Sequence, residues 1–478
     1  MTIFNETELI HLLQEYNPWW EQRRCTLELP EMQRRAYHDA LSILDEPGIR
    51  RFVVLSGARR VGKTTVMRQM IAELLSRGVN PDNILYLSFD NPVLKLTGIK
   101  PVIDAYDRAR PREGTRYFFL DEIQYAEDWS LWLKVLYDQR PELQLVATGS
   151  ASPYIEKGAR DSGVGRWRVL RMPTLNFYEY CELMRVKPEL PAEVSPEELA
   201  RMNPAELAGL MRRFAGMAPH WNRYLNIGGF PELLHLDNTF RAQSILREDV
   251  VDKVLKRDIP SLFDVRNTLQ LEKVFLYLCL HSGSLINAAA MCRQLEGVSQ
   301  PTLSRYMEFL QDANLIYICH SIDYSGKKGL SSQPKIYVAD VALRNATLMR
   351  NPERLSDEER GLMAETTVYR HFRNAYTSPC RVGYLRREQR EVDVAVDFPA
   401  GERLLCEVKY KNDSSLTADD AIMALCREKA AAAAFLATRN MEDFGVSCPA
   451  EGALPLIRIP AAVLCYLLGA VNASSYAG

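Results

Sequence analysis

Short apolar runs rich in β-forming residues alternate with longer helical stretches in the first third of the chain. The strand-like runs are Arg51–Ser56, Asn83–Phe89, Tyr117–Leu120 and Leu143–Thr148. Helical stretches such as Thr65–Arg77 lie between them. Because alternating strands and helices pack as a parallel sheet covered by helices, this pattern predicts an α/β domain.

The pattern changes along the rest of the chain. Residues 1–50 look helical, residues 173–263 are mostly helical, and residues 264–325 read as a small helical unit that closes with a strand. From about Leu343, helix, strands, helix and strand return, which predicts a second α/β domain. Near the N-terminus, Trp19 and Trp20 could bind a ligand or anchor the arm by packing, and packing is the interpretation that we favour.

Composition narrows the class of protein. The chain has 478 residues, which is enough for about three domains. Lys and Arg number 59 and Asp and Glu number 61, so the formal net charge is −2. With 47% hydrophobic and 25% charged residues, the composition is globular and excludes a disordered or fibrous chain. The neutral total also excludes a uniformly basic nucleic-acid coat, although it permits a local basic groove.

Cysteine usage and targeting signals bear on location. The ten cysteines form no C-x-x-C pair, which argues against a zinc site or redox dithiol and favours a reducing compartment. No basic segment followed by a long apolar stretch opens the sequence, and the apolar run from Ala461 to Val471 is too short to span a bilayer. We therefore expect a cytoplasmic protein with no membrane partner.

A glycine-rich loop predicts a phosphate-binding site. Gly57–Thr64 (GARRVGKT) fits G-x-x-x-x-G-K-[ST], follows the strand-like run RFVVLS and opens a helical stretch. The glycines permit a tight loop whose N–H groups surround phosphate oxygens at a helix N-terminus. Lys63 would contact the β- and γ-phosphates, and Thr64 would place a hydroxyl on Mg²⁺. The predicted nucleotide-binding residues are Gly57, Arg60, Gly62, Lys63, Thr64, Thr65, Asp121 and Ser150.

Polar residues at two further strand ends complete this predicted site. Asp121, after the apolar run YFFL, can hold Mg²⁺ through water, and the adjacent Glu122 can orient or deprotonate the attacking water. After the next strand a polar group could sense the γ-phosphate, and we prefer Ser150 to Thr148 for this role.

An arginine could act on the transition state. The candidates are Arg59 and Arg60 in the loop and Arg166 and Arg171 in GRWRVLRMP. We select Arg166, although each of the four could instead be a solvated or ion-paired arginine.

The stretches GARRVGKTT, LDEIQ and VATGS resemble, in order and spacing, prokaryotic AAA-type ATPases of the additional-strand class. Leu225–Glu232 and Lys256–Ile259 resemble the helical region of that family. The resemblance implies a doubly wound sheet, a helical lid and Mg-ATP. We therefore assign residues 1–30 to an N-terminal helical arm, 31–172 to a P-loop ATPase core and 173–263 to the lid.

Residues 264–342 resemble a winged helix-turn-helix. Ser299 caps a helix that carries an apolar stripe, and the strand LIYIC follows. Such modules often bind DNA and often serve only for packing or protein contact, so both alternatives stay open. The stripe consists of Leu303, Tyr306, Met307 and Leu310, and the residues nearer the exposed face are Gln300, Ser304, Arg305 and Glu308.

Carboxylates near the C-terminus form a second predicted site. In REVDVAVD and LLCEVK, Asp393, Glu407 and Lys409 fall on the face opposite the apolar residues and can converge in a hairpin. Glu365 lies within the apolar stripe of an upstream helix, which is costly unless it is paired or bound to metal. The set could bind Mg²⁺ or Mn²⁺ at Asp393 and Glu407, with Lys409 positioning a water. A charged sheet face with internal ion pairs is the alternative.

The order of Glu365, Asp393 and the Glu407-Val-Lys409 pair resembles the PD-(D/E)XK nuclease superfamily, with a departure at Val392 where the name pattern has proline. The resemblance covers residues 343–478 and implies a helix glutamate, a strand aspartate and an E-x-K pair as catalytic residues.

The leading hypothesis is an ATPase that controls a metal-dependent nuclease-like domain acting on nucleic acid, most simply DNA. The resemblance adds a role in prokaryotic defence or mobile-element handling. One alternative is a nucleotide-dependent switch or scaffold that binds DNA or a protein partner without cleavage. Another is a motor that translocates along nucleic acid as a homo-oligomeric ring.

Overall fold

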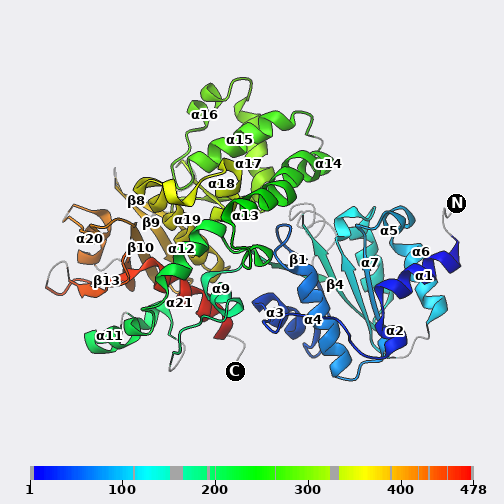
Figure 1. Cartoon of the computed structure of the whole chain (residues 1–478). Coiled ribbons are helices and arrows are strands. Elements are labelled where there is room, and N and C mark those ends of the chain that lie inside the picture. Colours follow the sequence, from blue (N-terminus) through cyan, green and yellow to red (C-terminus); the bar gives the residue numbers. More distant parts are fainter. Residues whose placement is uncertain are drawn as a thin grey trace. The chain divides into compact units, whose positions relative to one another are not determined.

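The structure is a computed structural model. It describes residues 5–110, 114–150, 165–190, 194–199, 201–263, 265–322, 333–387, 390–417, 419–428, 431–448 and 451–474. The chain divides into two compact units (Figure 1). The N-terminal unit is Met1–Pro173 with Asp312–Asn314, and the C-terminal unit is Thr174–Gln311 with Leu315–Gly478.

A parallel sheet with strand order β2-β3-β4-β1-β5 forms the core of the N-terminal unit. Helices on both faces make it doubly wound, as expected: α3 and α4 pack together on one face and α6 and α7 on the other (Figure 1). The sequence pattern does not predict β5, whose Arg168 and Arg171 are exposed. The strands are β1 (Phe52–Ser56), β2 (Ile84–Ser88), β3 (Arg116–Asp121), β4 (Leu143–Gly149) and β5 (Trp167–Arg171). The helices that follow the arm are α3 (Arg35–Leu44), α4 (Lys63–Ser76), α5 (Pro92–Thr97), α6 (Ile99–Ala109) and α7 (Trp129–Gln139), with short 3₁₀ turns at η1 (Pro81–Asn83) and η2 (Ile123–Tyr125).

The N-terminal arm covers the edge strand β2. Its helices are α1 (Glu6–Tyr16) and α2 (Trp19–Gln22). The buried Asn17 side chain accepts from Tyr86 N at 2.6 Å and donates to Tyr86 O at 2.9 Å, much as a neighbouring strand would. Trp19 and Trp20 are buried and donate their indole N–H groups to Ile84 O at 3.2 and 2.9 Å. The arm therefore satisfies an edge that would otherwise expose unpaired backbone groups, and the two tryptophans are packing anchors.

The first half of the C-terminal unit is helical and ends in a small antiparallel sheet, β6 with β7. Ser299 Oγ accepts from Thr302 N at 3.3 Å at the start of α17, as the N-cap prediction requires. The helices are α9 (Phe177–Leu183), α10 (Pro196–Leu199), α11 (Pro204–Arg212), α12 (Ala218–Ile227), α13 (Thr239–Leu246), α14 (Ile259–Phe263), α15 (Thr268–Leu280), α16 (Ala288–Gln294), α17 (Gln300–Asp312) and α18 (Val341–Leu348). The strands are β6 (Ile316–Cys319) and β7 (Lys335–Val338), and shorter helical turns are η3 (Pro231–Leu233), η4 (Arg247–Asp252), η5 (Val254–Asp258) and η7 (Pro352–Arg354).

A mixed sheet with strand order β12-β13-β11-β10-β9-β8 forms the second half of this unit. Strands β8, β9 and β10 are antiparallel neighbours, whereas β11 runs parallel to β10. Helices α19 and α21 pack on one side, and α20 packs on the apolar cluster that includes Val392 and Leu405. The strands are β8 (Arg381–Arg387), β9 (Arg390–Asp397), β10 (Arg403–Lys409), β11 (Ala433–Thr438), β12 (Gly445–Ser447) and β13 (Leu456–Pro460). The helices are α19 (Asp357–Ala375), α20 (Ala421–Arg427) and α21 (Ala461–Ser474).

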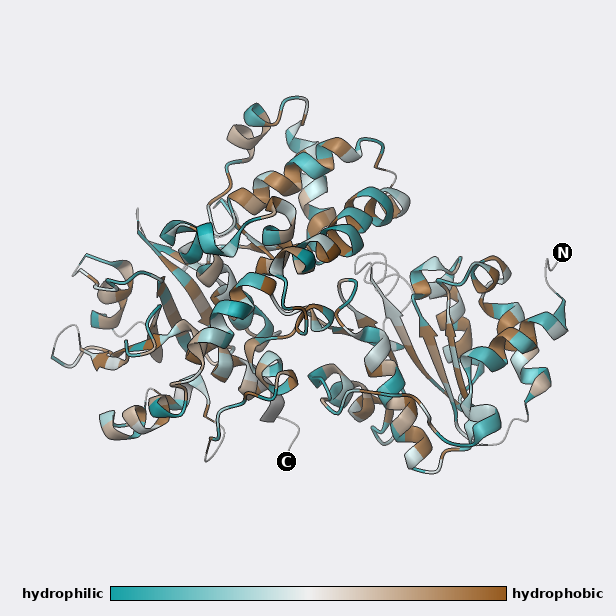
Figure 2. Cartoon of the chain, in the orientation of Figure 1, coloured by the Kyte–Doolittle hydropathy of each residue, from teal (hydrophilic) through white to brown (hydrophobic). Residues whose placement is uncertain are grey.

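The apolar run near the C-terminus is a core helix. Residues 461–468 and Ala470 of α21 are buried, and hydrophobic residues also dominate the sheet strands of both units (Figure 2). Burial of such side chains is the main favourable contribution to folding. Among the described residues, no helix is both long and apolar enough to cross a bilayer.

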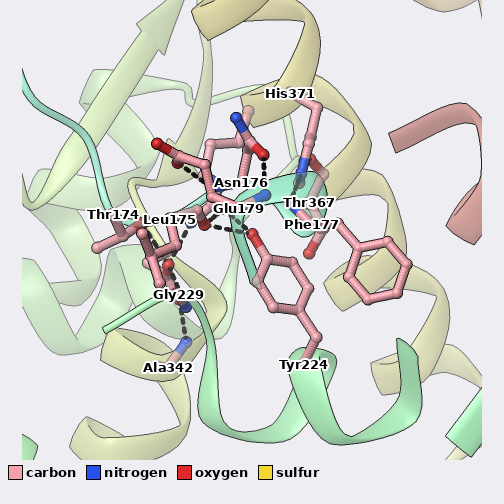
Figure 3. Close-up of polar contacts among 12 residues, drawn as sticks. Thr174, Leu175, Asn176, Phe177, Glu179, Tyr224, Gly229, Ala342, Thr367 and His371 are labelled. Carbon is pink, nitrogen blue, oxygen red and sulfur yellow. Dashed lines mark hydrogen bonds and ion pairs between the residues drawn. The ribbon is translucent and has the colours of Figure 1, made fainter. Parts of the chain in front are cut away.

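A buried polar cluster holds the first residues of the C-terminal unit (Figure 3). Arg370 forms an ion pair with Asp340 and donates to Leu175 O at 2.7 Å, and Asp340 also accepts from Thr174 Oγ1 at 2.6 Å. His371 Nε2 accepts from Phe177 N at 2.8 Å. Burial and the nearby Arg370 charge lower the pKa of His371 to about 3, so this histidine is neutral.

The glycine pair in the LNIGGFPE segment is explained by the same cluster. A Cβ on Gly228 would lie 2.0 Å from Asp340 Oδ1, and one on Gly229 would lie 2.1 Å from Leu175 O. Gly229 N instead donates to Asp340 Oδ2 at 3.1 Å. Only residues without a side chain permit this approach.

Candidate functional site

The glycine-rich loop lies between the carboxyl end of β1 and the N-terminus of α4, as predicted. Gly62 has a φ of 95°, which favours glycine. A Cβ on Gly57 would meet Met172 O at 2.2 Å, so the loop passes directly over the residue that follows β5. Lys63 is buried and donates to Gly57 O at 2.9 Å and Ala58 O at 2.8 Å.

Asp121, at the end of β3, is the hub of the polar contacts beside the loop. Its Oδ2 accepts from Thr64 Oγ1 at 2.7 Å and from Tyr86 OH at 3.0 Å. Its Oδ1 accepts from the Thr148 hydroxyl. The structure thus brings together a hydroxyl and a carboxylate of the types that bind Mg²⁺, so these residues fit the predicted ion.

Glu122 is held next to this pair in a left-handed backbone conformation, with a φ of 49°. Its main-chain N–H donates to Thr148 Oγ1 at 3.0 Å, and its carboxylate accepts from Gln124 Nε2. Burial tends to raise the pKa of Glu122, but the charge of Lys63 and the Gln124 hydrogen bond outweigh it and hold the pKa below its usual value. The carboxylate is therefore ionised at neutral pH, as a water-orienting base must be.

Thr148 and Ser150 both contribute to the site. Gln124 Nε2 donates to Ser150 Oγ at 3.0 Å, and a Ser150 hydrogen bond also helps to hold the pKa of Glu122 below its usual value. Thr148 contacts Asp121 and the Glu122 backbone. The preference for Ser150 as the residue that senses the γ-phosphate stays a prediction.

The structure places two of the arginine candidates, Arg166 and Arg171, beside opposite ends of β1. Arg166 lies at the amino end of β1, where Phe52 N donates to Arg166 O at 3.0 Å, and its side chain pairs with Asp138 at 2.9 Å. The glycine-rich loop is at the other end of β1, about 13 Å away along the strand. The selection of Arg166 as a catalytic residue for its own chain is thus corrected, because a strand length separates it from the loop. Arg171, in register with Ser56, lies at the loop end.

Two supporting contacts escaped the sequence analysis, which named Arg59 only as a candidate for the transition state. Arg34, just before α3, donates to Val61 O at 2.8 Å and so supports the loop from a segment that precedes it. Arg59 donates to Tyr125 OH at 2.6 Å. Neither contact has a signature in the sequence, because each joins residues that the motifs do not connect.

A second group of charged residues lies in the C-terminal unit, where α19, β9 and β10 meet. We call Glu365, Glu391, Asp393 and Glu407 the acid cluster. Asp393 Oδ2 accepts from Val408 N at 3.0 Å, which ties β9 to β10 beside Glu407. Burial and the charge of Asp393 raise the pKa of Glu365 to about 7 and the pKa of Glu407 to about 8.

Lys335, the first residue of β7, lies in the middle of three of these carboxylates. Its Nζ is 2.9 Å from Glu391 Oε1, 3.2 Å from Asp393 Oδ1 and 3.3 Å from Glu365 Oε1. Burial alone would lower the pKa of Lys335, but the three carboxylates outweigh burial and raise it. The sequence analysis did not single out Lys335, because nothing in the local pattern connects it to acids on later elements.

Lys409 contacts Glu407 at 3.1 Å and Asp420 at 3.6 Å. The other carboxylate oxygen of Glu407, Oε2, is buried and has no hydrogen-bond partner among the residues that the structure describes. The predicted group of Glu365, Asp393, Glu407 and Lys409 therefore gathers at one place. As the side chains lie, however, the described residues contain no group of three His, Cys, Asp or Glu side chains arranged to hold one metal ion.

Helix α17, which was expected to belong to a winged-helix-like module, has the faces that the sequence predicts. Leu303, Tyr306 and Leu310 of α17 are buried, and Met307 is partly buried. The exposed residues include all four that were expected nearer the surface, namely Gln300, Ser304, Arg305 and Glu308.

Two family models match parts of the chain. Residues 49–181 match an AAA domain, and residues 218–354 match a domain of unknown function. The first match covers the glycine-rich loop and all five strands of the parallel sheet, so it supports the P-loop ATPase fold that the motifs predict for the N-terminal unit.

Several uncharacterized proteins are similar over most of their length. One of Haemophilus influenzae is 25% identical over 61% of this chain and 68% of its own. One of Methanocaldococcus jannaschii is 24% identical over 72% of this chain and 71% of its own length. One of Mycobacterium tuberculosis is 26% identical over 76% of this chain and 71% of its own length.

Among solved structures, the Walker-type ATPase PABY2304 of Pyrococcus abyssi is similar, with 15% identity and a TM-score of 0.40, over 69% of this chain and 99% of that one. The ORC2 protein of Aeropyrum pernix in ADPNP–ADP complexes has 13% identity and a TM-score of 0.35, over 72% of this chain and 96% of that one.

Proposed function

We propose that the N-terminal unit binds Mg-ATP and hydrolyses it. The observation that carries the proposal is the joined set of Thr64, Asp121 and an ionised Glu122 beside the glycine-rich loop. The AAA-domain match over residues 49–181 supports the same activity.

Each residue has a distinct role in this proposal. Loop N–H groups and Lys63 bind the phosphates, and Lys63 exchanges its bonds to the loop carbonyls for phosphate oxygens. Thr64 and Asp121 would hold Mg²⁺, which neutralises charge on the phosphates. Glu122 orients the attacking water and accepts its proton.

Lys63→Ala tests the ATPase proposal. We expect the variant to lose ATP turnover, because no other described residue combines a buried ammonium with the loop. Lys100→Ala is the matched control, since Lys100 is exposed on α6 and pairs with Asp104. Unchanged turnover in Lys63→Ala would overturn the assignment.

We also propose that the C-terminal unit is a metal-dependent nuclease whose engagement with DNA is controlled by the nucleotide state of the N-terminal unit. The gathering of Glu365, Asp393, Glu407 and Lys409 on α19, β9 and β10 supports this activity. The unsatisfied Glu407 Oε2 supports it further, because a buried carboxylate oxygen without a donor suits a cation. The defence or mobile-element role rests on the family resemblance alone.

In this proposal Asp393 and Glu407 would hold Mg²⁺ or Mn²⁺, which would supply a bound water of lowered pKa. Lys409, paired with Glu407, orients the attacking water and stabilises negative charge that develops on the phosphodiester. Glu365 positions the other groups through its contacts with Tyr337 and Lys335.

Cleavage of labelled single- and double-stranded DNA and RNA, with Mg²⁺ or Mn²⁺ and with or without ATP, tests the nuclease proposal. We expect Lys409→Ala to abolish cleavage and the exposed neighbour Lys411→Ala to retain it. A parent protein that turns over ATP but cuts nothing would overturn the nuclease proposal. It would favour a switch or scaffold that binds DNA or a protein partner.

A direct role of α17 in DNA binding is the most specific part of the partner proposal. Arg305 is exposed on that helix, together with Gln300 and Ser304. We expect Arg305→Ala to weaken DNA binding, measured by fluorescence anisotropy at two salt concentrations. Unchanged binding would leave α17 with a packing role.

A further inference from the structure

The position of Lys335 sets a condition on metal binding in the acid cluster. A lysine ammonium has three protons, and Lys335 has three carboxylates within 3.3 Å, so its donors are fully used. The side chain is buried, and no solvent competes for it. The cluster therefore already binds one compact cation.

The lysine uses the same oxygens that a metal ion would need. Asp393 Oδ1 accepts from Lys335 Nζ, while its Oδ2 accepts from Val408 N. Glu365 Oε1 accepts from both Lys335 and Tyr337 OH. This explains why no group of three acidic, histidine or cysteine side chains among the described residues is arranged around one metal ion.

The cluster nevertheless has capacity for a further or different cation. Its four carboxylates face two lysines, Lys335 and Lys409, so negative charge exceeds positive charge when all are ionised. Glu407 Oε2 is the independent sign, because it is buried without any donor. A divalent ion in place of the monovalent ammonium would compensate more of this charge.

The lysine and the acids come from different parts of the fold. Lys335 and Tyr337 belong to β7, in the winged-helix-like module, whereas the acids belong to α19, β9 and β10. A shift of β7 relative to α19 would withdraw Lys335 and, with it, the Tyr337 hydrogen bond to Glu365, while Asp393 would keep its bond from Val408 N.

We propose that Lys335 is an internal cation that competes with a divalent metal ion for the acid cluster, in which Asp393 is the shared ligand, so that the metal enters only when β7 withdraws the lysine. This inference rests on the proposed nuclease site. It makes Lys335 a positioning residue that sets metal affinity, and it makes the winged-helix-like module the element that controls access.

Titration of the nucleotide-free full chain with Mn²⁺ tests the inference by calorimetry and by the electron paramagnetic resonance signal of free Mn²⁺. In this titration the parent protein carries Asp121→Asn, which removes the metal ligand of the ATP site, and every variant carries the same substitution. We expect Lys335→Met to bind Mn²⁺ about tenfold more tightly than this parent, because a buried positive charge is removed from the ligands. We expect the metal-free variant to melt at a lower temperature and added Mn²⁺ to restore the loss. Lys411→Met, at an exposed lysine, should match the parent.

A second variant keeps the test decisive if Lys335→Met does not fold. Glu391→Gln removes one of the three partners of Lys335 and leaves Glu365, Asp393 and Glu407 unchanged. We expect its Mn²⁺ affinity to rise about threefold. Unchanged or weaker Mn²⁺ binding in the folded variants would overturn the inference.

Adding Asp393→Asn separates this inference from the nuclease proposal. If the parent and Lys335→Met bind Mn²⁺ equally and through Asp393, the inference fails and the metal site stands. If Lys335→Met gains affinity through Asp393 but no variant cleaves nucleic acid, the inference stands and the nuclease proposal fails.

Discussion

The two candidate sites hold a buried lysine in opposite ways. Lys63 donates to two main-chain carbonyl oxygens of its own loop, whereas Lys335 is surrounded by three carboxylates. Carbonyl oxygens carry only partial charge, so an arriving phosphate is a better partner for Lys63 and can replace them. The carboxylates of the acid cluster can release Lys335 only if another cation compensates their charge. The first site is thus prepared to receive an anion, and the second to exchange one cation for another.

The sites also differ in how they are assembled. The ATP site draws its loop, lysine and hydroxyl from one run of consecutive residues, and β3 and β4 add the rest at the same sheet edge. The acid cluster needs three elements, α19, β9 and β10, to meet, and β7 adds Lys335. A change in tertiary packing would therefore alter the acid cluster far more than the phosphate loop.

Glu122→Gln should give the largest effect and isolate the chemical step of the first site. Turnover should fall about 10³-fold, because the amide cannot accept the proton of the attacking water. ATP binding should survive, because Lys63 and the loop remain. Glu127→Gln, at an exposed position in the following turn, is the matched control, and turnover and nucleotide affinity are measured separately. Equal turnover in the two variants would remove Glu122 from the mechanism.

Replacing each buried lysine by methionine compares the two sites directly. Without metal, Lys335→Met should lower the free energy of unfolding by about 3 kcal/mol, because it leaves buried carboxylates without their cation. Lys63→Met should lower it less, by about 1 kcal/mol, since it removes two hydrogen bonds to main-chain carbonyls and leaves Glu122, whose ionised form its charge favours, with the Gln124 hydrogen bond. Urea denaturation at pH 8 with a chelator measures both. Equal losses would contradict the difference between the sites.

The sequence could predict the first site because its chemistry is local. Gly57–Thr64 specify the loop and its lysine, and Asp121 and Glu122 follow an apolar strand directly. It could not predict which end of β1 Arg166 would occupy, because β5 is short and carries exposed arginines. Nor could it predict that Thr148 contacts Asp121, since that depends on how the neighbouring strands β3 and β4 are aligned.

The second site was predictable only in part. Alternation in β9 and β10 placed Asp393, Glu407 and Lys409 on one face, as the structure has them. The pairing of Lys335 with these acids depends on how β7 packs against α19 and β9. The need for glycine at Gly228 and Gly229 was likewise not predictable, because it comes from their close approach to Asp340 and Leu175, which lie outside their own segment.

The pH dependence of stability should distinguish the acid cluster from the rest of the chain. Glu365 and Glu407 have pKa values of about 7 and 8 when folded, above the usual 4.5, so the folded state binds more protons than the unfolded state. Stability must therefore fall as pH rises toward 8, by up to about 1.4 kcal/mol per pH unit for each group. Below pH 6.5, His371 contributes the opposite slope, because its pKa is lowered to about 3.

The measurement is the urea midpoint between pH 6.5 and 8 in the presence of a chelator. Glu407→Gln should flatten the slope, because the amide does not ionise, and Glu402→Gln on an exposed turn should leave it unchanged. Bound Mn²⁺ should flatten the parent slope as well, since it favours the ionised carboxylates. Part of the slope should remain in Glu407→Gln, because Glu365 still ionises; an unchanged slope would show that Glu407 does not contribute to it.

The smallest expected effects concern Arg171, the last residue of β5, and Arg166, which directly precedes that strand. Arg166→Ala should change turnover by less than about twofold and stability by less than about 0.5 kcal/mol, because its pair with Asp138 is exposed and far from the loop. Arg171→Ala should lower turnover by about tenfold if this side chain stabilises phosphate charge from its place beside Ser56. Steady-state ATP turnover of the two variants, assayed at equal protein concentration, makes the comparison. A larger loss in Arg166→Ala would mean that Arg166 acts on a nucleotide bound by a second copy of the chain, because its own loop lies at the opposite end of β1.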